Sequence, residues 1–312
     1  MSGLANAPER RPAQAGGMSA ELFARWTAYI DASPRTVETY SRNIRHFRAY
    51  LLQRGISRPQ REDVIAYREE LKRDHKPATV QGYLTAVKLF FRWTAQEGLY
   101  PDVAGRVKGA KTSPGHKKDA LTTKQVGRML SEIDRSTLRG LRDYALLALM
   151  VTTGLREISV AQADVGDIRN VGDAAVLFYR GKGQEEKAEY VKLAGPVEEA
   201  LRAYLAARGE KDGRAPLFCS LANRNGGGRL TTRSISRVAK ERLLDAGLAS
   251  DRLTGHSLRH TAATLNLLNG GTLEETRQLL GHANLNTTLL YAHALTREKN
   301  DSEARIARAI FE

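Results

Sequence analysis

The sequence has 312 residues, of which 41% are hydrophobic and 27% are charged, and this composition excludes a chain that is disordered throughout. Its 49 Lys and Arg against 35 Asp and Glu give a formal net charge of +14, which indicates a polyanionic partner. The single cysteine, Cys219, excludes a disulfide framework and a cysteine-rich zinc site. The longest apolar run, residues 144–151, is far shorter than the roughly 20 residues that cross a bilayer, so we expect no membrane contact.

The basic excess is concentrated in the N-terminal third. Residues 1–118 hold 21 Lys and Arg against 11 Asp and Glu, whereas residues 119–312 hold 28 against 24. Because these cations lie within helical patterns and not in one tail, their placement favours nucleic acid over an anionic membrane or a merely solvated surface. The N-terminus lacks the apolar segment of a secretory signal, so a cytoplasmic location is expected.

The N-terminal part predicts a small helical bundle. Residues 1–17 have no periodicity and are expected to form a flexible tail. Apolar residues at helical spacing then predict helices over 19–30, 35–52, 62–72 and 78–97. Ser19 is a suitable N-cap, Pro34 suits a first turn, and Gly98 ends the last helix. We therefore predict an all-helical domain over residues 18–104.

A second, mixed domain is predicted after a linker. Residues 105–118 are rich in glycine and basic residues and have little to bury, which is typical of a linker. Within 119–312, residues 174–194 hold two β-type runs that predict an antiparallel hairpin. Helices are expected over 143–152, 197–207, 234–246, 260–268, 273–280 and 303–311. The fold class is therefore mainly α, with an α+β second domain.

Four short motifs of the second domain carry the residue types that metal-free attack on a phosphodiester needs. A phosphodiester is an anion and its pentacoordinate transition state carries more charge, so two planar guanidiniums suit it. An ammonium can protonate the leaving 5′-oxygen, and a tyrosine can store the bond covalently. The candidates are Arg156 in 152–156, Lys182 in 181–183, His256 and Arg259 in 256–260, His282 in 280–282, and Tyr291.

Each candidate also has an ordinary structural interpretation. Arg156 could form a helix ion pair, Lys182 could be a solvated turn residue, and Tyr291 could be a core aromatic. The two histidines could be satisfied, half-buried side chains. Order and spacing together favour the chemical interpretation: His-x-x-Arg is followed after 23 residues by a Leu-Gly-His histidine, and after nine more by a tyrosine.

This ordered set of motifs resembles the tyrosine recombinases, the integrase family that includes Xer-type recombinases and the integrases of mobile elements. The resemblance implies an N-terminal four-helix, SAM-like core-binding domain, a basic linker and a catalytic domain. It makes Arg156 the first catalytic arginine, Lys182 the hairpin lysine and His256 with Arg259 the His-x-x-Arg pair. His282 takes the His/Trp position and Tyr291 is the nucleophile.

The resemblance also implies a mechanism and partners. Tyr291 would form a 3′-phosphotyrosine, and the freed 5′-hydroxyl would attack the linkage in a partner duplex, without ATP, metal or another cofactor. The partner would be double-stranded DNA with inverted-repeat core sites, because only a short tail precedes residue 22 where arm-binding integrases carry a further domain. The C-terminal stripe around residues 306–311 would join four copies in the synaptic complex, or else dock on its own domain.

Residues for DNA contact follow from the same resemblance. Arg42 and Arg45 on the second helix and Lys88 and Arg92 on the fourth would contact bases or phosphates. The linker would contribute Lys108 and Lys111 to the DNA backbone.

One position departs from the family pattern. The family usually has an acidic residue three positions after the first arginine, where it helps to order the active site, and here that residue is Ser159. Glu157 is displaced to the position directly after Arg156, where we expect it to face away from the site as an exposed charge.

Two other functions remain open at this stage. A type IB topoisomerase shares the arginine, lysine, histidine and tyrosine chemistry, although the helical N-terminal domain and Leu-Gly-His argue against it. A catalytically silent DNA-binding regulator could use the same scaffold. The biological task, whether integration, excision or resolution, is also left open.

Overall fold

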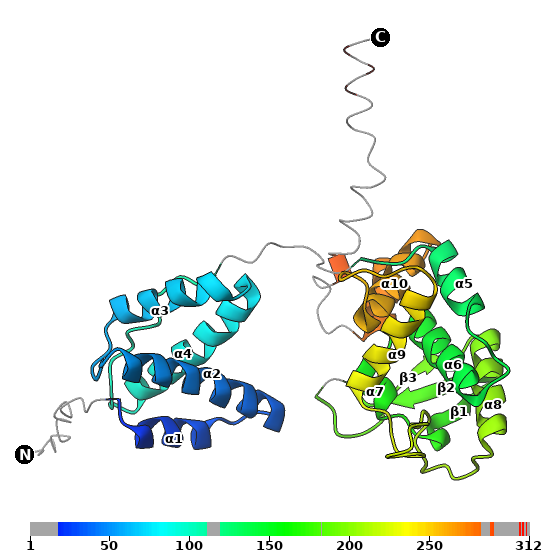
Figure 1. Ribbon diagram of the computed structural model, residues 1–312, viewed down its shortest axis with the longest axis horizontal. Coiled ribbons are helices and arrows are strands. Elements are labelled where there is room, and N and C mark those ends of the chain that lie inside the picture. The colour runs from blue at the N-terminus through cyan, green and yellow to red at the C-terminus, as the bar shows by residue number, and fades with distance from the viewer. Residues whose placement is uncertain are drawn as a thin grey trace, which may run out of the picture. The chain divides into compact units, whose positions relative to one another are not determined.

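The computed structural model describes residues 18–110, 119–181, 183–281, 288–289, 306, 308 and 310. The chain divides into two compact units, Met1–Pro114 and Gly115–Glu312, whose elements are labelled in Figure 1. The expected tail over 1–17 lies outside the described residues. In the described parts of both units, no helix is both long enough and apolar enough to cross a membrane.

The N-terminal unit is a bundle of four helices, which confirms the predicted fold class. Ser19 and Ser33 cap the first two helices by accepting hydrogen bonds from the backbone N–H groups of Leu22 and Thr36. Prolines occupy the first turn of the second and fourth helices, where no backbone N–H is needed. The helices are α1 (Ala20–Tyr29), α2 (Pro34–Gln53), α3 (Arg61–Asp74) and α4 (Pro77–Gln96).

Aromatic side chains fill the core of this bundle. Phe47, Phe90 and Phe91 are completely buried. Phe23 from α1 stacks on Phe90 from α4 with 4.6 Å between ring centroids, and Trp26 meets the same ring edge-on at 5.8 Å. Because these pairs join the first helix to the last, the bundle is closed by its apolar faces and its basic side chains are left on the outside.

The C-terminal unit is built around one buried helix, α6 (Leu138–Thr153). The helix α8 (Gly195–Arg208) and the helix α10 (Gly255–Leu268) pack against it. This arrangement confirms the buried helix predicted from the apolar run at 143–152, whose residues are covered on nearly all sides. Other α-helices of the unit, within the described residues 119–281, are α5 (Thr123–Ser131), α7 (Glu157–Ala161), α9 (Thr232–Asp245) and α11 (Leu273–Leu280).

A small antiparallel sheet in the order β1-β2-β3 completes the unit (Figure 1). The predicted hairpin is β2 (Ala174–Tyr179) with β3 (Glu189–Lys192), in a register that pairs Tyr179 with Glu189. The first strand, β1 (Ile168–Val171), was not predicted. Three of its four residues are exposed, so it lacks the alternation of apolar and polar residues that identifies a strand in a sequence.

The start of α10 also differs from the prediction. The helix was expected from residue 260, yet it begins at Gly255, so that His256 and Arg259 belong to its first turns. Thr254 precedes the helix, and its backbone N–H donates to the Ser257 hydroxyl at 2.9 Å. Because glycine is a poor helix former, the sequence does not indicate that the helix begins at Gly255. The helix expected over 303–311 lies mostly outside the described residues. The three residues of this range that are described, Ile306, Arg308 and Ile310, are helical.

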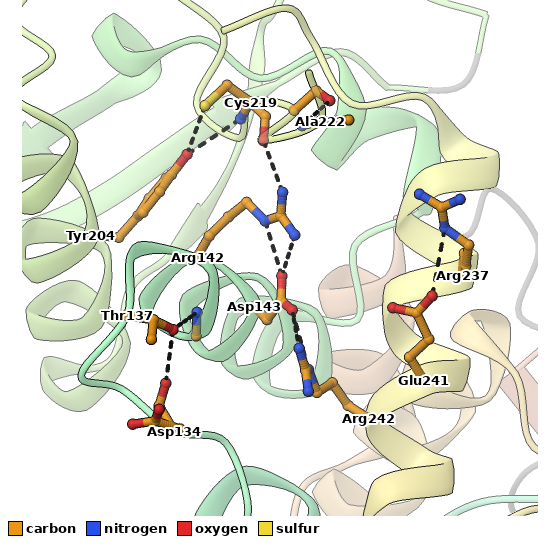
Figure 2. Close-up of polar contacts among 12 residues, drawn as sticks. Asp134, Thr137, Arg142, Asp143, Tyr204, Cys219, Ala222, Arg237, Glu241 and Arg242 are labelled. Carbon is orange, nitrogen blue, oxygen red and sulfur yellow. Dashed lines mark hydrogen bonds and ion pairs between the residues drawn. The ribbon is translucent and has the colours of Figure 1, made fainter. Parts of the chain in front are cut away.

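Two helices of the C-terminal unit are joined by a buried ionic network, shown in Figure 2. Asp143 on α6 is 1% exposed and accepts hydrogen bonds at 2.7 Å from Arg142 and at 2.8 Å from Arg242 on α9. Arg142 also donates to the carbonyl oxygen of Cys219, whose sulfur lies 3.3 Å from the hydroxyl of Tyr204. The carboxylate of Asp143 therefore connects α6 to α9 through Arg242, and its partner Arg142 connects α6 to the segment around Cys219.

We expect Asp143→Ala to lower the free energy of unfolding of the C-terminal unit by about 3–5 kcal/mol, because it leaves the buried Arg142 without its counterion. Denaturation followed by far-UV circular dichroism measures the loss. Both tryptophans, Trp26 and Trp93, belong to the N-terminal unit, so their fluorescence transition should stay in place. The control is Asp245→Ala, which removes a 50% exposed partner of Arg242 and should cost at most about 1 kcal/mol.

Candidate active site

Arg156 lies in the sharp turn between α6 and α7. The helix α6 ends at Gly154, whose backbone is left-handed with φ of 64°, and Arg156 is the N-cap of α7. A Cβ at Gly154 would lie 2.7 Å from Leu280 and 3.2 Å from Ala262, so the position requires glycine for both its conformation and its surroundings. This close packing holds Gly154, two residues before the half-buried Arg156, against the middle of α10 and the end of α11.

The helix α10 carries the His-x-x-Arg pair. His256 is exposed, whereas Arg259 is 5% exposed and His260, which follows it, is 7% exposed. The rings of His256 and His260 meet edge to face, with 5.0 Å between their centroids. Because residues three or four positions apart share one helix face, the imidazole of His256 and the guanidinium of Arg259 lie on the same side of α10.

Arg259 joins three of the predicted motifs. Its guanidinium donates to the carbonyl oxygen of Gly154 at 2.6 Å and to that of Leu280 at 2.5 Å. Gly154 directly precedes the Leu155-Arg156 pair, and Leu280 directly precedes Gly281 and His282. Three segments that are far apart in the sequence are thus brought to one place by a single buried side chain.

The base of the β2–β3 hairpin lies at the same place. A Cβ on Gly281 would be 3.3 Å from both the Tyr179 hydroxyl and a Glu189 carboxylate oxygen. Burial raises the pKa of Tyr179, the hydrogen bond to Glu189 and the charge of Glu189 raise it further, and nearby Arg156 and Arg259 lower it. The raised pKa keeps Tyr179 protonated, so that its hydroxyl can donate to the carboxylate.

Three of the six predicted catalytic residues are described by the structure, and it brings Arg156, His256 and Arg259 together. Lys182, His282 and Tyr291 lie outside the described residues. Among the neighbours of Lys182, Gln184 donates from its side chain to Glu189 at 3.1 Å and from its backbone N–H to the carbonyl oxygen of Gly181 at 3.2 Å. In the described part of the chain, the side chains of His, Cys, Asp and Glu form no group of three that could hold a metal ion.

Sequence reasoning missed the Tyr179–Glu189 pair and placed Glu157 wrongly. Glu157 is half-buried and accepts a hydrogen bond from the Ser236 hydroxyl at 2.7 Å, so it does not face away as an exposed charge. Ser159 is 4% exposed and donates to the carbonyl oxygen of Arg180 at 3.3 Å, which connects α7 to the start of the hairpin loop. A five-residue helix is too short to show which of its faces is buried.

The predicted DNA-contact residues of the N-terminal unit lie on its surface. Arg42 and Arg45 are exposed on α2, Arg92 is exposed and Lys88 half-exposed on α4, and Lys108 is exposed after α4. Lys111 lies outside the described residues. The sequence alone did not single out the hollow of about 450 Å³ beside Lys108, which Arg68, Lys72 and His75 also line.

The arrangement in the C-terminal unit fits an anionic group of tetrahedral shape. The half-buried guanidinium of the α6–α7 turn can bind oxygens of a phosphodiester in the planar, two-pronged manner of arginine. The buried guanidinium of Arg259 adds positive charge to the same place while its two terminal nitrogens hold the carbonyl oxygens of Gly154 and Leu280. The imidazole of His256 at the exposed edge can exchange a proton with such a group.

We expect Arg259→Lys to lower the free energy of unfolding of the C-terminal unit by about 1–3 kcal/mol, because one ammonium leaves a buried carbonyl oxygen of Gly154 or Leu280 without its donor. Thermal unfolding followed by circular dichroism measures the loss. Arg252→Lys is the control, since Arg252 is 59% exposed and pairs with Asp119 on the surface. Equal stability of the two variants would contradict the joining role of Arg259.

Comparison with families of known proteins covers both units. Residues 119–298 match the model of the phage integrase family, and residues 22–99 match that of the phage integrase N-terminal SAM-like domain. Tyrosine recombinase XerC of Myxococcus xanthus is 31% identical to the chain over 282 residues, which span 86% of this chain and 92% of the relative.

Comparison with solved structures shows the same fold. The XerH site-specific recombinase bound to palindromic difH substrate has a TM-score of 0.69 at 22% identity, covering 88% of this chain and 78% of that one. A lambda integrase from a tetramer bound to a Holliday junction has a TM-score of 0.70 at 16% identity, covering 89% and 78%. The predicted combination of a SAM-like helical domain with a mixed domain is thereby confirmed.

Proposed function

The chain belongs to the phage integrase family and is a tyrosine recombinase, and we propose that it exchanges DNA strands at specific sites through a 3′-phosphotyrosine on Tyr291. The observation that carries this proposal is the pair of hydrogen bonds by which Arg259 joins the segments of Arg156 and His282. They hold the segment that carries Arg156 and the segment that ends at Leu280 against one buried cation, and this supports the proposal. The proposed catalytic centre would lie in the domain predicted over residues 119–312.

The step conserves bonds and protons. The phenol oxygen of Tyr291 forms a bond to phosphorus while the bond from phosphorus to the 5′-oxygen breaks, and Lys182 gives the leaving oxygen its proton. The phenol proton passes to an imidazole, for which His256 and His282 are suited. Arg156 and Arg259 stabilise the charge that develops on the non-bridging oxygens. The 5′-hydroxyl of a partner duplex then reverses the step, so that no ATP or metal ion is consumed.

The N-terminal unit and the linker are proposed to hold the duplex. Arg42 and Arg45 on α2 and Arg92 on α4 are exposed and offer positive charge to the phosphates, whose contacts dominate the affinity of such proteins. The hollow beside Lys108 provides a further cationic surface where the linker begins. Inverted-repeat core sites are favoured because XerH, which shares this fold, is bound to a palindromic substrate.

The test of the proposed function is Tyr291→Phe. It should abolish the covalent adduct on a nicked suicide duplex and leave DNA affinity unchanged, because it removes only the attacking oxygen. The control is Tyr190→Phe, which alters a 46% exposed tyrosine of β3 and should form the adduct normally.

Other outcomes of this experiment identify the competing functions. A wild-type protein that binds DNA without forming any adduct would be a silent regulator. Relaxation of a single supercoiled plasmid that lacks paired sites would indicate a type IB topoisomerase. An adduct formed by Tyr291→Phe would show that another residue is the nucleophile.

Assembly on DNA is proposed to use the C-terminal segment. Ile306 and Ile310 are helical, one turn apart, and 59% and 66% exposed. A second copy offers a hollow of about 370 Å³ between α9 and residues 248–253, whose lining includes Leu248 and the 61% exposed Leu244. Burial of these apolar surfaces against each other would join four protomers, the number found in the lambda integrase complex.

We expect the double variant Ile306→Ser with Ile310→Ser to form smaller complexes on paired DNA sites than the wild-type tetramer. Sedimentation of the protein mixed with the paired sites measures the size of these complexes. Leu244→Ser should have the same effect, because it alters the receiving surface. The control Leu52→Ser changes a leucine that is 65% exposed in the N-terminal unit and should leave the tetramer intact. Tetramers that persist in the double variant would contradict this assembly.

A further inference from the structure

Glu157 occupies a position from which it contacts two other helices of the catalytic unit. It directly follows Arg156 and is the first residue of α7. The hydroxyl of Ser236 on α9 donates to its carboxylate at 2.7 Å. The Glu157 side chain is half-buried, so its orientation is set by contacts with neighbouring residues such as Ser236.

The same carboxylate lies against the first residue of α10. A Cβ built on Gly255 would lie 2.2 Å from the carboxylate oxygen of Glu157 and 3.3 Å from the Cα of Ser236. A side chain at this position would therefore displace the carboxylate. Gly255 has no positive φ, so two approaches favour glycine here: the movable carboxylate of Glu157 and the backbone of Ser236.

The location suits a negative charge. The first N–H groups of a helix have no partners within it, and the peptide dipoles place a partial positive charge at this end. His256 follows Gly255 directly, and Arg259 lies one turn further along α10. A change in the tilt or position of this helix end would therefore move both side chains relative to Arg156.

We propose that Glu157 is a positioning residue, which fixes the start of α10, with His256 and Arg259, against the turn that carries Arg156. It touches no reacting atom and acts through Ser236 and Gly255. The inference rests on the proposed function, because the cleavage step is the property that it tunes. No contact of the N-terminal unit is involved, so DNA binding should not depend on it.

The first experiment measures single-turnover cleavage of a nicked suicide duplex at increasing DNA concentration. Glu157→Ala should lower the saturating rate about tenfold, and Glu157→Gln about threefold, because glutamine keeps an oxygen for Ser236 and loses only the charge at the helix end. The DNA concentration at half-saturation should not change. The control is Glu241→Ala, which removes a 51% exposed carboxylate of α9 and should cleave at the wild-type rate.

The second experiment is a double-mutant cycle with Gly255→Ala. In the wild-type background the added methyl should displace the carboxylate and slow cleavage about tenfold. In the Glu157→Ala background it should slow cleavage less than about twofold, because no carboxylate remains to be displaced. The approach to Ser236 Cα is present in both backgrounds and cancels in the cycle. Additive effects of the two substitutions would overturn the proposal.

A readout independent of catalysis separates this proposal from the proposed function. Amide hydrogen exchange over residues 255–259 should accelerate in Glu157→Ala and stay unchanged in Glu241→Ala. If the wild-type protein forms no covalent adduct, the proposed function fails and exchange alone decides the role of Glu157. If the wild type cleaves and Glu157→Gln and Glu157→Ala both match it in rate and in exchange, only the positioning role is overturned.

Discussion

The two hydrogen bonds from Arg259 to the carbonyl oxygens of Gly154 and Leu280 are the interaction on which the catalytic unit depends. They join the end of α6, the first turns of α10 and the end of α11, which also meet through the packing of Leu280 against Gly154 and through a hydrogen bond from Asn266 to Thr276. The guanidinium is suited to this role because its planar fork offers several N–H donors in fixed directions. The residue that we propose to bind phosphate thus also forms part of the framework of the site.

Much of the fold could be predicted from local patterns. The helices α2 and α4 begin at Ser33-Pro34 and Lys76-Pro77, where a fixed proline φ and a missing N–H make the start visible in the sequence. The hairpin was visible because its strands contain β-branched and aromatic residues. The start of α10 was not, since Gly255 is packed against Glu157 and Ser236, which are both distant from it in the sequence.

The candidate site was predictable only as a set of residue types in order. The spacing of His256, Arg259, His282 and Tyr291 predicts the chemistry that we propose, but spacing carries no information on which carbonyl oxygens a buried arginine binds. The positions of Glu157 and Ser159 illustrate the same limit. Helical periodicity placed Glu157 on the outer face, whereas tertiary packing against Ser236 decided its environment.

The only cysteine of the sequence, Cys219, is buried in the folded protein. Cys219 is 2% exposed, and its sulfur and backbone both contact the hydroxyl of Tyr204. Since thiol–disulfide exchange requires an accessible thiolate, this buried cysteine cannot form intermolecular disulfides while the protein is folded. Mild oxidation should therefore cross-link only molecules whose C-terminal unit has unfolded. In a folded protomer, a cysteine introduced on the surface would be the single reactive thiol.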